Sequence, residues 1–169
     1  GQPAAVEVLR GLGDPRLVPP QARYERVPLG KQVAALYARG DHPLADAAQV
    51  DAVAMRRFGV ATITISPALL EGVAVLYGFE NAADFPLAVE CDDLGTLVHL
   101  ATRTDVLALV PCAVGDAHPL ALCRLLTVTT LAPVADVHAI WLGGRTLSPS
   151  AQRAIDLAKR LGGEGGGSA

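Results

Sequence analysis

The sequence predicts an α/β fold in which a mainly parallel sheet is flanked by helices. Residues 60–65 are rich in β-branched side chains, which favours a strand, and residues 66–77 repeat apolar side chains at helical spacing. The same alternation returns at residues 87–91 and 94–101, followed by an apolar run at 106–110. Strands that alternate with helices in this way are typical of crossover connections between parallel strands. Right-handed crossovers place such helices on both faces of the sheet.

The composition supports a packed core and argues against several classes of protein. Hydrophobic residues make up 51% of the 169 residues, which is enough for a core of mainly aliphatic side chains. The formal net charge of −3 argues against this chain gripping a phosphate backbone by itself. The sequence shows neither a signal peptide nor the roughly 18–20 unbroken apolar residues of a membrane helix. Three separated cysteines indicate a reducing compartment, so we expect a cytoplasmic protein with no membrane partner.

The first part of the chain alternates apolar runs with breaks. Residues 6–9 are a short apolar run that we interpret as a strand. The glycines and proline of residues 11–15 interrupt regular structure, and the proline pair at 19–20 keeps the chain extended. Residues 32–38 are again apolar and end in the turn-rich residues 39–43.

Capping residues mark the starts of the next helices. Asp46 is the candidate N-cap of a short helix that includes residues 50–55. Ser66 and Pro67 open the following helix, since serine can cap and proline suits the first turn, and Gly78 is its expected end. The pair Asp92 and Asp93 caps the helix over residues 94–101 in the same way.

Two strands and a helix are expected in the last part of the chain. Residues 125–129 and 137–142 are the strand candidates. Ser148 and Pro149 open a helix whose apolar side chains share one face and which the glycine pair 162–163 should end. The Gly/Ser-rich residues 162–169 are expected to be a disordered tail.

The sequence lacks the motifs of common catalytic sites. It contains no G-x-S-x-G elbow, no P-loop and no H-E-x-x-H. Gly11 and Gly13 follow a candidate strand, but the third glycine of a dinucleotide-binding motif is missing. No histidine has a second ligand at metal-binding spacing, so we predict no metal site and no cofactor. The four histidines are His42, His99, His118 and His138.

Asp92, Asp93 and Cys112 are the candidates for an enzyme active site. The two aspartates come where a strand passes into a helix, so they are either catalytic carboxylates at the sheet edge or helix caps. Cys112 is either a reactive thiol or a small buried side chain. We favour the structural interpretation for all three side chains.

Ser66 has two interpretations that the residues alone leave open. A strand-to-helix junction points backbone N–H groups outward and can bind an anion, and ligands of open α/β sheets collect at the carboxyl ends of strands. The alternative is a plain helix cap without a ligand. No Arg or Lys flanks Ser66 in the sequence, so an anion would depend on backbone donors and on groups brought in by the fold.

Residues 38–45, ARGDHPLA, resemble the HPLA turn of LysR-type transcriptional regulators, which follows the strand that crosses between two sensing lobes. Residues 6–14 are similar to the family's strand before that turn, and residues 94–111 to its helix–strand unit ending in proline. Residues 137–142 and 148–151 resemble the returning strand and the closing helix. The order and spacing agree over nearly the whole chain. Residues 101–105 depart from the family's usual glycine-containing segment.

The resemblance implies a sensing domain like the type II periplasmic binding proteins, with two α/β lobes. Residues 41–130 would form the second lobe. Residues 1–40 would be a remnant of the first lobe with the crossover strand, and residues 131–161 its return strand and closing helix. The strands at 6–9 and 137–142 should therefore pair. The family's two opening strand–helix units and its winged helix-turn-helix have no counterpart, so we interpret the chain as N-terminally truncated.

The resemblance also implies that a small organic acid binds in a cleft between the lobes and controls transcription. Its further implications are a homodimer or tetramer in the full-length protein and DNA contact only through the absent winged helix-turn-helix. The alternatives are a small α/β enzyme with its site at the carboxyl edge of the sheet, or a solute-binding protein. No catalytic residue is predicted. The expected effector-binding residues are Thr64, Ile65, Ser66, Pro67, Val110, Pro111 and Cys112.

Overall fold

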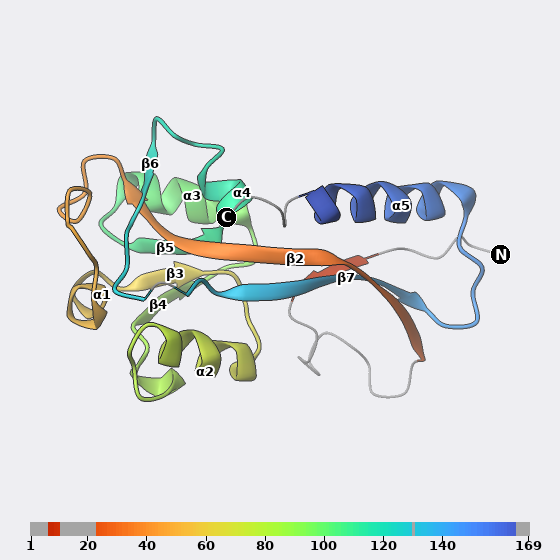
Figure 1. Cartoon of the computed structure of the whole chain (residues 1–169), viewed down its shortest axis with the longest axis horizontal. Coiled ribbons are helices and arrows are strands. Elements are labelled where there is room, and N and C mark those ends of the chain that lie inside the picture. Colours follow the sequence, from red (N-terminus) through yellow and green to blue (C-terminus); the bar gives the residue numbers. More distant parts are fainter. Residues whose placement is uncertain (1–6, 11–22, 130, 165–169) are drawn as a thin grey trace. The chain divides into compact units, whose positions relative to one another are not determined.

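The structure is a computed structural model that describes residues 7–10, 23–129 and 131–164. The chain divides into two compact units (Figure 1). Unit 1 comprises residues 1–32 and 134–169, and unit 2 comprises residues 33–133. The long strand β2 (Tyr24–Arg39) belongs to unit 1 in its first half and to unit 2 in its second half. The expected chain breaks at residues 11–15 and 19–20 lie outside the described residues.

Unit 2 alternates strands and helices along the chain. After β2 its elements are α1 (Ala52–Phe58), β3 (Val60–Thr62), α2 (Pro67–Leu76), the 3₁₀ helix η1 (Ala82–Asp84), β4 (Leu87–Glu90), α3 (Leu94–Arg103), β5 (Leu107–Pro111), α4 (Cys112–Gly115) and β6 (Leu122–Arg124).

The sheet of unit 2 has the order β6–β2–β5–β3–β4 and contains both strand directions. β3 runs parallel to β4 and to β5, and helices α2 and α3 supply the crossovers that parallel neighbours need. β2 pairs antiparallel with β5 and with β6. The predicted α/β class is confirmed, but the prediction of a mainly parallel sheet is wrong. The sheet is mixed, because β3 pairs in parallel with β4 and β5 whereas β2 pairs antiparallel with β5 and β6.

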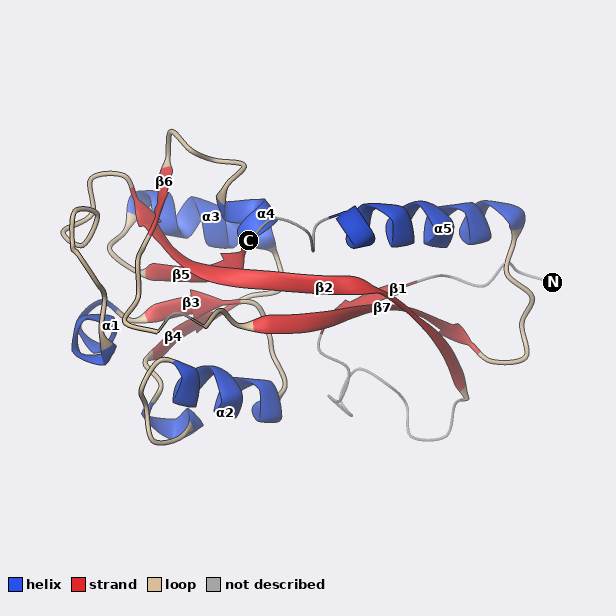
Figure 2. Cartoon of the chain, viewed as in Figure 1, coloured by secondary structure: helices blue, strands red, loops and turns tan. Residues whose placement is uncertain are grey.

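Two apolar clusters cover opposite faces of this sheet. Neighbouring residues of each strand alternate between them, so that Leu36 and Leu107 join one cluster while Tyr37 and Ala108 join the other. Side chains of α1 and α2 complete the first cluster, and side chains of α3 and α4 complete the second. Figure 2 shows these helices on the two sides of the strands.

Unit 1 contains β1 (Glu7–Arg10), β7 (Val134–Leu142) and α5 (Pro149–Glu164) beside the first half of β2. β1 pairs antiparallel with β7, as expected, with Leu9 opposite His138. Ala139 of β7, Leu29 of β2 and Ile155 of α5 form the buried centre of this unit. The opening of α5 at Pro149 is also as expected, with Ser148 accepting a hydrogen bond from the Ala151 N–H.

The prediction that Asp46 caps the first helix of unit 2 is wrong. The cap is Asp51, whose carboxylate accepts a hydrogen bond of 2.8 Å from the Ala54 N–H. The helix cannot begin earlier because Val50 is held in extended form, bridged to Thr127. The expected strand at residues 125–129 is wrong as well. The strand lies earlier, at Leu122–Arg124, and beyond it the Leu125 N–H donates to the Leu36 carbonyl oxygen at 2.9 Å.

The glycine pair 162–163 does not end α5, which continues to Glu164. A glycine within a helix costs only about 1 kcal/mol relative to alanine, so it weakens a helix without forbidding it.

The first half of β2 was also not expected as a strand. Its pairing with β7 compensates for a weakly apolar sequence.

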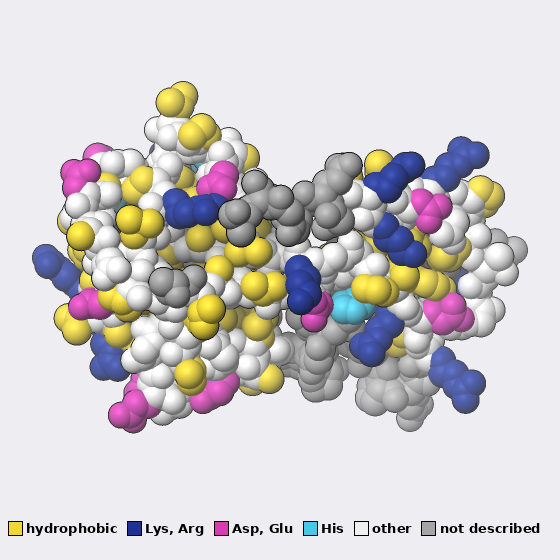
Figure 3. All heavy atoms as spheres, viewed as in Figure 1, with side chains coloured by type: hydrophobic (Ala, Val, Ile, Leu, Met, Phe, Trp, Pro, Cys, Tyr) yellow, Lys and Arg dark blue, Asp and Glu magenta, His cyan; other side chains and the backbone are white. Residues whose placement is uncertain are grey.

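On the face of the molecule in Figure 3, basic and acidic side chains are interspersed.

Candidate functional site

The carboxyl ends of β3, β4 and β5 lie at one edge of the unit 2 sheet. Thr62, the last residue of β3, stands opposite Leu109 of β5 and Glu90 of β4. The residues that follow these strands therefore begin at the same edge. The structure brings both expected segments, residues 64–67 and 110–112, to this edge.

The expected strand at residues 60–65 ends at Thr62, so Thr64 and Ile65 lie in the connection to α2. Thr64 lies outside the strand ladder, and its N–H donates to Asp92 Oδ1 at 3.2 Å. This contact places the Asp92 carboxylate beside the β3–α2 connection. No local pattern predicts this contact, because the two residues are 28 positions apart.

Ser66 caps α2, as predicted. Its hydroxyl oxygen accepts a hydrogen bond of 3.2 Å from the Leu69 N–H, and Pro67 occupies the start of the helix. The half-buried Ser66 hydroxyl keeps its proton to donate. Pro67 brings no N–H and the Leu69 N–H is occupied, so the first turn offers fewer backbone donors than its sequence position suggests.

Asp93 is the N-cap of α3, which confirms its structural interpretation. Its carboxylate accepts from the Thr96 N–H at 2.5 Å, and this hydrogen bond holds the pKa of Asp93 below its ordinary value. The carboxylate consequently stays ionised at neutral pH, where it also complements the helix dipole.

The β5 side of the edge is more enclosed. Val110 and Pro111 are buried at the end of β5, and Pro111 stands opposite Ala34 of β2. Cys112 is half-buried, carries a free thiol and begins α4 directly after the strand. Because β5 pairs in parallel with β3, these three residues lie next to the start of the β3–α2 connection, and we refer to them as the wall.

A polar network behind this wall was not predicted from the sequence. Tyr37 of β2 is only 1% exposed, and its hydroxyl donates to Asp116 Oδ1 at 2.7 Å. Arg124 Nε donates to the same hydroxyl at 3.1 Å. Burial, and then the Asp116 carboxylate, raise the pKa of Tyr37 above its ordinary value, so the hydroxyl remains protonated.

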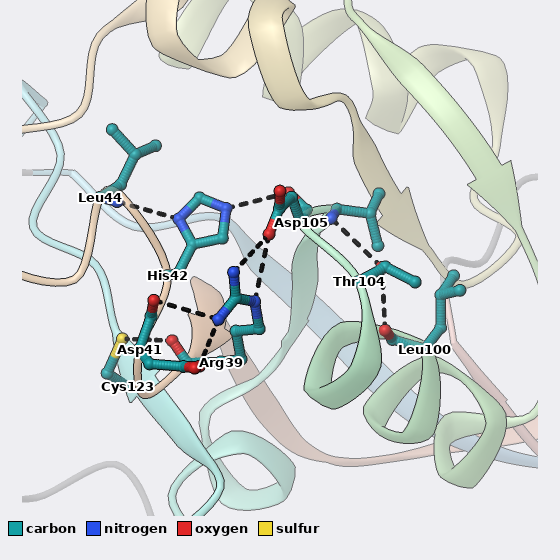
Figure 4. A network of polar contacts seen from close by, with 9 residues as sticks. Arg39, Asp41, His42, Leu44, Leu100, Thr104, Asp105 and Cys123 are labelled. Atoms are coloured by element: carbon teal, nitrogen blue, oxygen red, sulfur yellow. Dashed lines mark hydrogen bonds and ion pairs between the residues drawn. The ribbon is translucent and has the colours of Figure 1, made fainter.

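The HPLA turn after β2 is held by a second network (Figure 4). Arg39 Nη2 donates to Asp105 Oδ1 at 2.7 Å, and the same guanidinium pairs with Asp41, whose pKa it holds below the ordinary value. His42 is 3% exposed, and its Nδ1 accepts from the Leu44 N–H at 3.0 Å. Its Nε2 therefore carries the proton and donates to the Asp105 carbonyl oxygen. His42 is thus a structural side chain of the turn.

Within residues 7–10, 23–129 and 131–164, no three His, Cys, Asp or Glu side chains gather as a metal site. The helices of those ranges include none with the length and apolar character needed to cross a bilayer.

Comparison with protein families gives one match, to the LysR substrate binding domain, over residues 11–162. Comparison with curated protein sequences gives no match. Among solved structures, HinK, a LysR family transcriptional regulator from Pseudomonas aeruginosa, is similar with a TM-score of 0.64 and 13% identity. The similarity covers 94% of this chain and 53% of HinK, so the chain spans about half of that regulator.

Two separate regulatory domains are similar at comparable levels. The effector binding domain of QuiR, in complex with shikimate, has a TM-score of 0.61 and 16% identity, covering 87% of this chain and 69% of that one. The regulatory domain of CcmR from Synechocystis PCC6803, in complex with 2-PG, has a TM-score of 0.60 and 13% identity. Here the coverage is 92% of this chain and 72% of the CcmR domain. At these identities the similarity shows the shared fold.

Proposed function

Because the chain belongs to the LysR substrate-binding domain family, we propose that it senses a small organic acid and passes the signal to a DNA-binding transcription factor. The observation that carries the proposal is the family match over residues 11–162. QuiR and CcmR, which share the fold, are both seen with small organic acids. An effector acts in such a domain by binding one conformation better than another, which shifts the population.

We assign the second lobe of this sensor to residues 41–130. The first lobe is represented by residues 1–40, which include the crossover strand, and by residues 131–161. The division of the chain into units at 32/33 and 133/134 supports this assignment, because both boundaries fall close to those expected. The full-length regulator would be a cytoplasmic homodimer or tetramer that contacts DNA through a winged helix-turn-helix.

The effector-binding wall of unit 2 would comprise residues 64–67 and 110–112. The location of both segments at the carboxyl edge of the sheet supports this assignment. The Asp92 carboxylate accepts a hydrogen bond from the Thr64 N–H. Its negative charge therefore disfavours the acid group of an effector next to Thr64. The acid group of an effector would instead lie beside the Ser66 hydroxyl, near Pro111 and Cys112.

The proposal is tested by the stabilising effect of small carboxylic acids and phosphates on the chain. Shikimate and 2-phosphoglycolate are suitable first probes, and we expect weak binding, with a dissociation constant of roughly 1 mM. A ligand at roughly 20 mM would then stabilise the native state by about 1.8 kcal/mol and raise Tm by roughly 4–7 °C. Sodium chloride at equal ionic strength and the methyl ester of each acid are the controls. A panel of acids that leaves Tm at the control value contradicts the proposal.

We expect this chain to bind double-stranded DNA no better than a generic acidic protein. The formal net charge is −3, and basic and acidic side chains are interspersed on the face shown in Figure 3, whereas DNA-binding surfaces concentrate positive charge. A mobility-shift experiment with the promoter region of the regulator's own gene measures this. Sub-micromolar, sequence-selective binding would show that the chain contacts DNA directly.

A further inference from the structure

The hydrogen bonds of Tyr37, Asp116 and Arg124 join three elements of unit 2. Tyr37 belongs to β2, Asp116 directly follows α4, and Arg124 is the last residue of β6. The Tyr37 hydroxyl donates to one Asp116 oxygen and accepts from Arg124 Nε. Arg124 Nη2 donates to the second Asp116 oxygen at 2.6 Å, so each of the three groups contacts the other two.

The shape of Tyr37 holds α4 in place as well. A Cβ atom added at Gly115 would overlap the Tyr37 ring, so the backbone of α4 lies directly against this ring. The Arg124 guanidinium carbon lies 5.8 Å from the ring centroid. Since the ring is 1% exposed, α4 cannot shift across it without losing these contacts.

The contacts with Tyr37 matter because α4 has little stability of its own. It is four residues long, and its cap residue, Pro111, makes no side-chain capping hydrogen bond. Helices this short depend on tertiary packing, because the free-energy cost of nucleating a helix exceeds the stabilisation from the hydrogen bonds of a single turn. The position of Cys112, the first residue of α4, therefore depends on the contacts that hold the end of the helix.

We propose that Tyr37, Asp116 and Arg124 are positioning residues for the effector wall at Pro111 and Cys112. The proposal rests on the proposed function, and the three side chains act through α4 without touching the effector. They hold the wall in one geometry before the ligand arrives, so that binding does not have to order it. The half-exposed ion pair of Asp116 and Arg124 contributes mainly by orienting the buried Tyr37 hydroxyl.

The first test replaces Tyr37 by phenylalanine, which removes the hydroxyl and keeps the ring. Tyr77→Phe is the matched control, because Tyr77 is buried in the apolar cluster on the opposite face of the sheet. The measurement is the rate at which iodoacetamide alkylates Cys112 in the native chain, read by peptide mass spectrometry. Half-buried Cys91, which directly follows β4, is the internal reference.

We expect Cys112 to react about tenfold faster in the Tyr37→Phe chain, because the variant loses the stabilisation that about one hydrogen bond gives to the position of α4. The Cys91 rate and the Tyr77→Phe chain should match the wild type. An unchanged Cys112 rate, or equal rises in both tyrosine variants, would overturn the proposal.

The second test measures the affinity for the acid that binds most tightly among shikimate, 2-phosphoglycolate and the other probes. Tyr37→Phe should weaken binding about tenfold while Tyr77→Phe leaves it unchanged. Equal affinities of the wild type and Tyr37→Phe would overturn the positioning role even if Cys112 reacts faster. If Cys112 responds as expected and no acid binds the wild type, the proposed function fails, whereas the fixing of α4 by the network stands.

Discussion

Replacement of Gly115 by alanine is expected to lower the free energy of unfolding by about 3 kcal/mol, the upper part of the range for overpacked cores. The added methyl group would overlap the ring of Tyr37, which is 1% exposed and has no free space to enter. Hydrogen bonds to Asp116 and Arg124 also oppose rotation of the ring away from Gly115. Urea denaturation of the wild type and the variant measures the difference.

Gly72→Ala is the matched control for this experiment. Gly72 lies within α2, and a Cβ atom added there meets nothing within 4 Å. Alanine should therefore stabilise the chain by up to about 1 kcal/mol through its higher helix propensity. Gly115→Ala should cost less in a Tyr37→Leu background than in the wild type, because the shorter side chain leaves room for the added methyl group. Equal stabilities of Gly115→Ala and the wild type would show that α4 can move away from the ring.

Ser66→Asp is expected to abolish most of the response to an acidic effector while the domain stays folded. Aspartate caps helices as well as serine does, so α2 should keep its stability. Its added negative charge would repel an acid group at the proposed site by about 2 kcal/mol, which weakens binding roughly 30-fold. Isothermal titration of the chain and reporter-gene induction in the intact regulator measure the effect.

Ser66→Asn and Ser66→Ala separate the cap from the ligand contact. Asparagine keeps the cap without adding charge, so Ser66→Asn should retain far more affinity than Ser66→Asp. Ser66→Ala loses about 1 kcal/mol of helix stability and one hydroxyl donor, and should weaken induction without unfolding the domain. A wild-type effector response in Ser66→Asp and Ser66→Ala, with normal expression, would remove Ser66 from the site and leave it as a helix cap.

The helix starts of unit 2 show how far local signals reach. Ser66 and Asp93 were predictable as caps because capping depends on a side chain and an N–H three residues later. Asp46 failed by the same logic, because Asp51 is an equally good cap and the bridge of Val50 to Thr127 decides between them. The capping rule thus identifies candidate N-cap residues, and a contact with a distant segment selects among them.

The strand directions of unit 2 were also predictable only in part. The crossovers that make β3, β4 and β5 parallel were predictable, because each connection contains a helix of sufficient length. The antiparallel pairing of β2 with β5 and β6 had no local signal. It depends on which sheet edge β2 meets after it enters unit 2.

The sequence by itself determined the α/β class, the caps of α2 and α3, and the two segments that meet at the carboxyl edge of the sheet. The class and the caps follow from periodicity and capping, which act over a few residues, and the two segments follow from the resemblance to LysR-type regulators. Only the tertiary structure decided that the Asp92 carboxylate accepts a hydrogen bond from the Thr64 N–H. It also decided that Tyr37, Asp116 and Arg124 form one network. The partners of Tyr37 are 79 and 87 positions away along the chain. Contacts over such separations arise from the packing of whole elements, which short-range patterns do not encode.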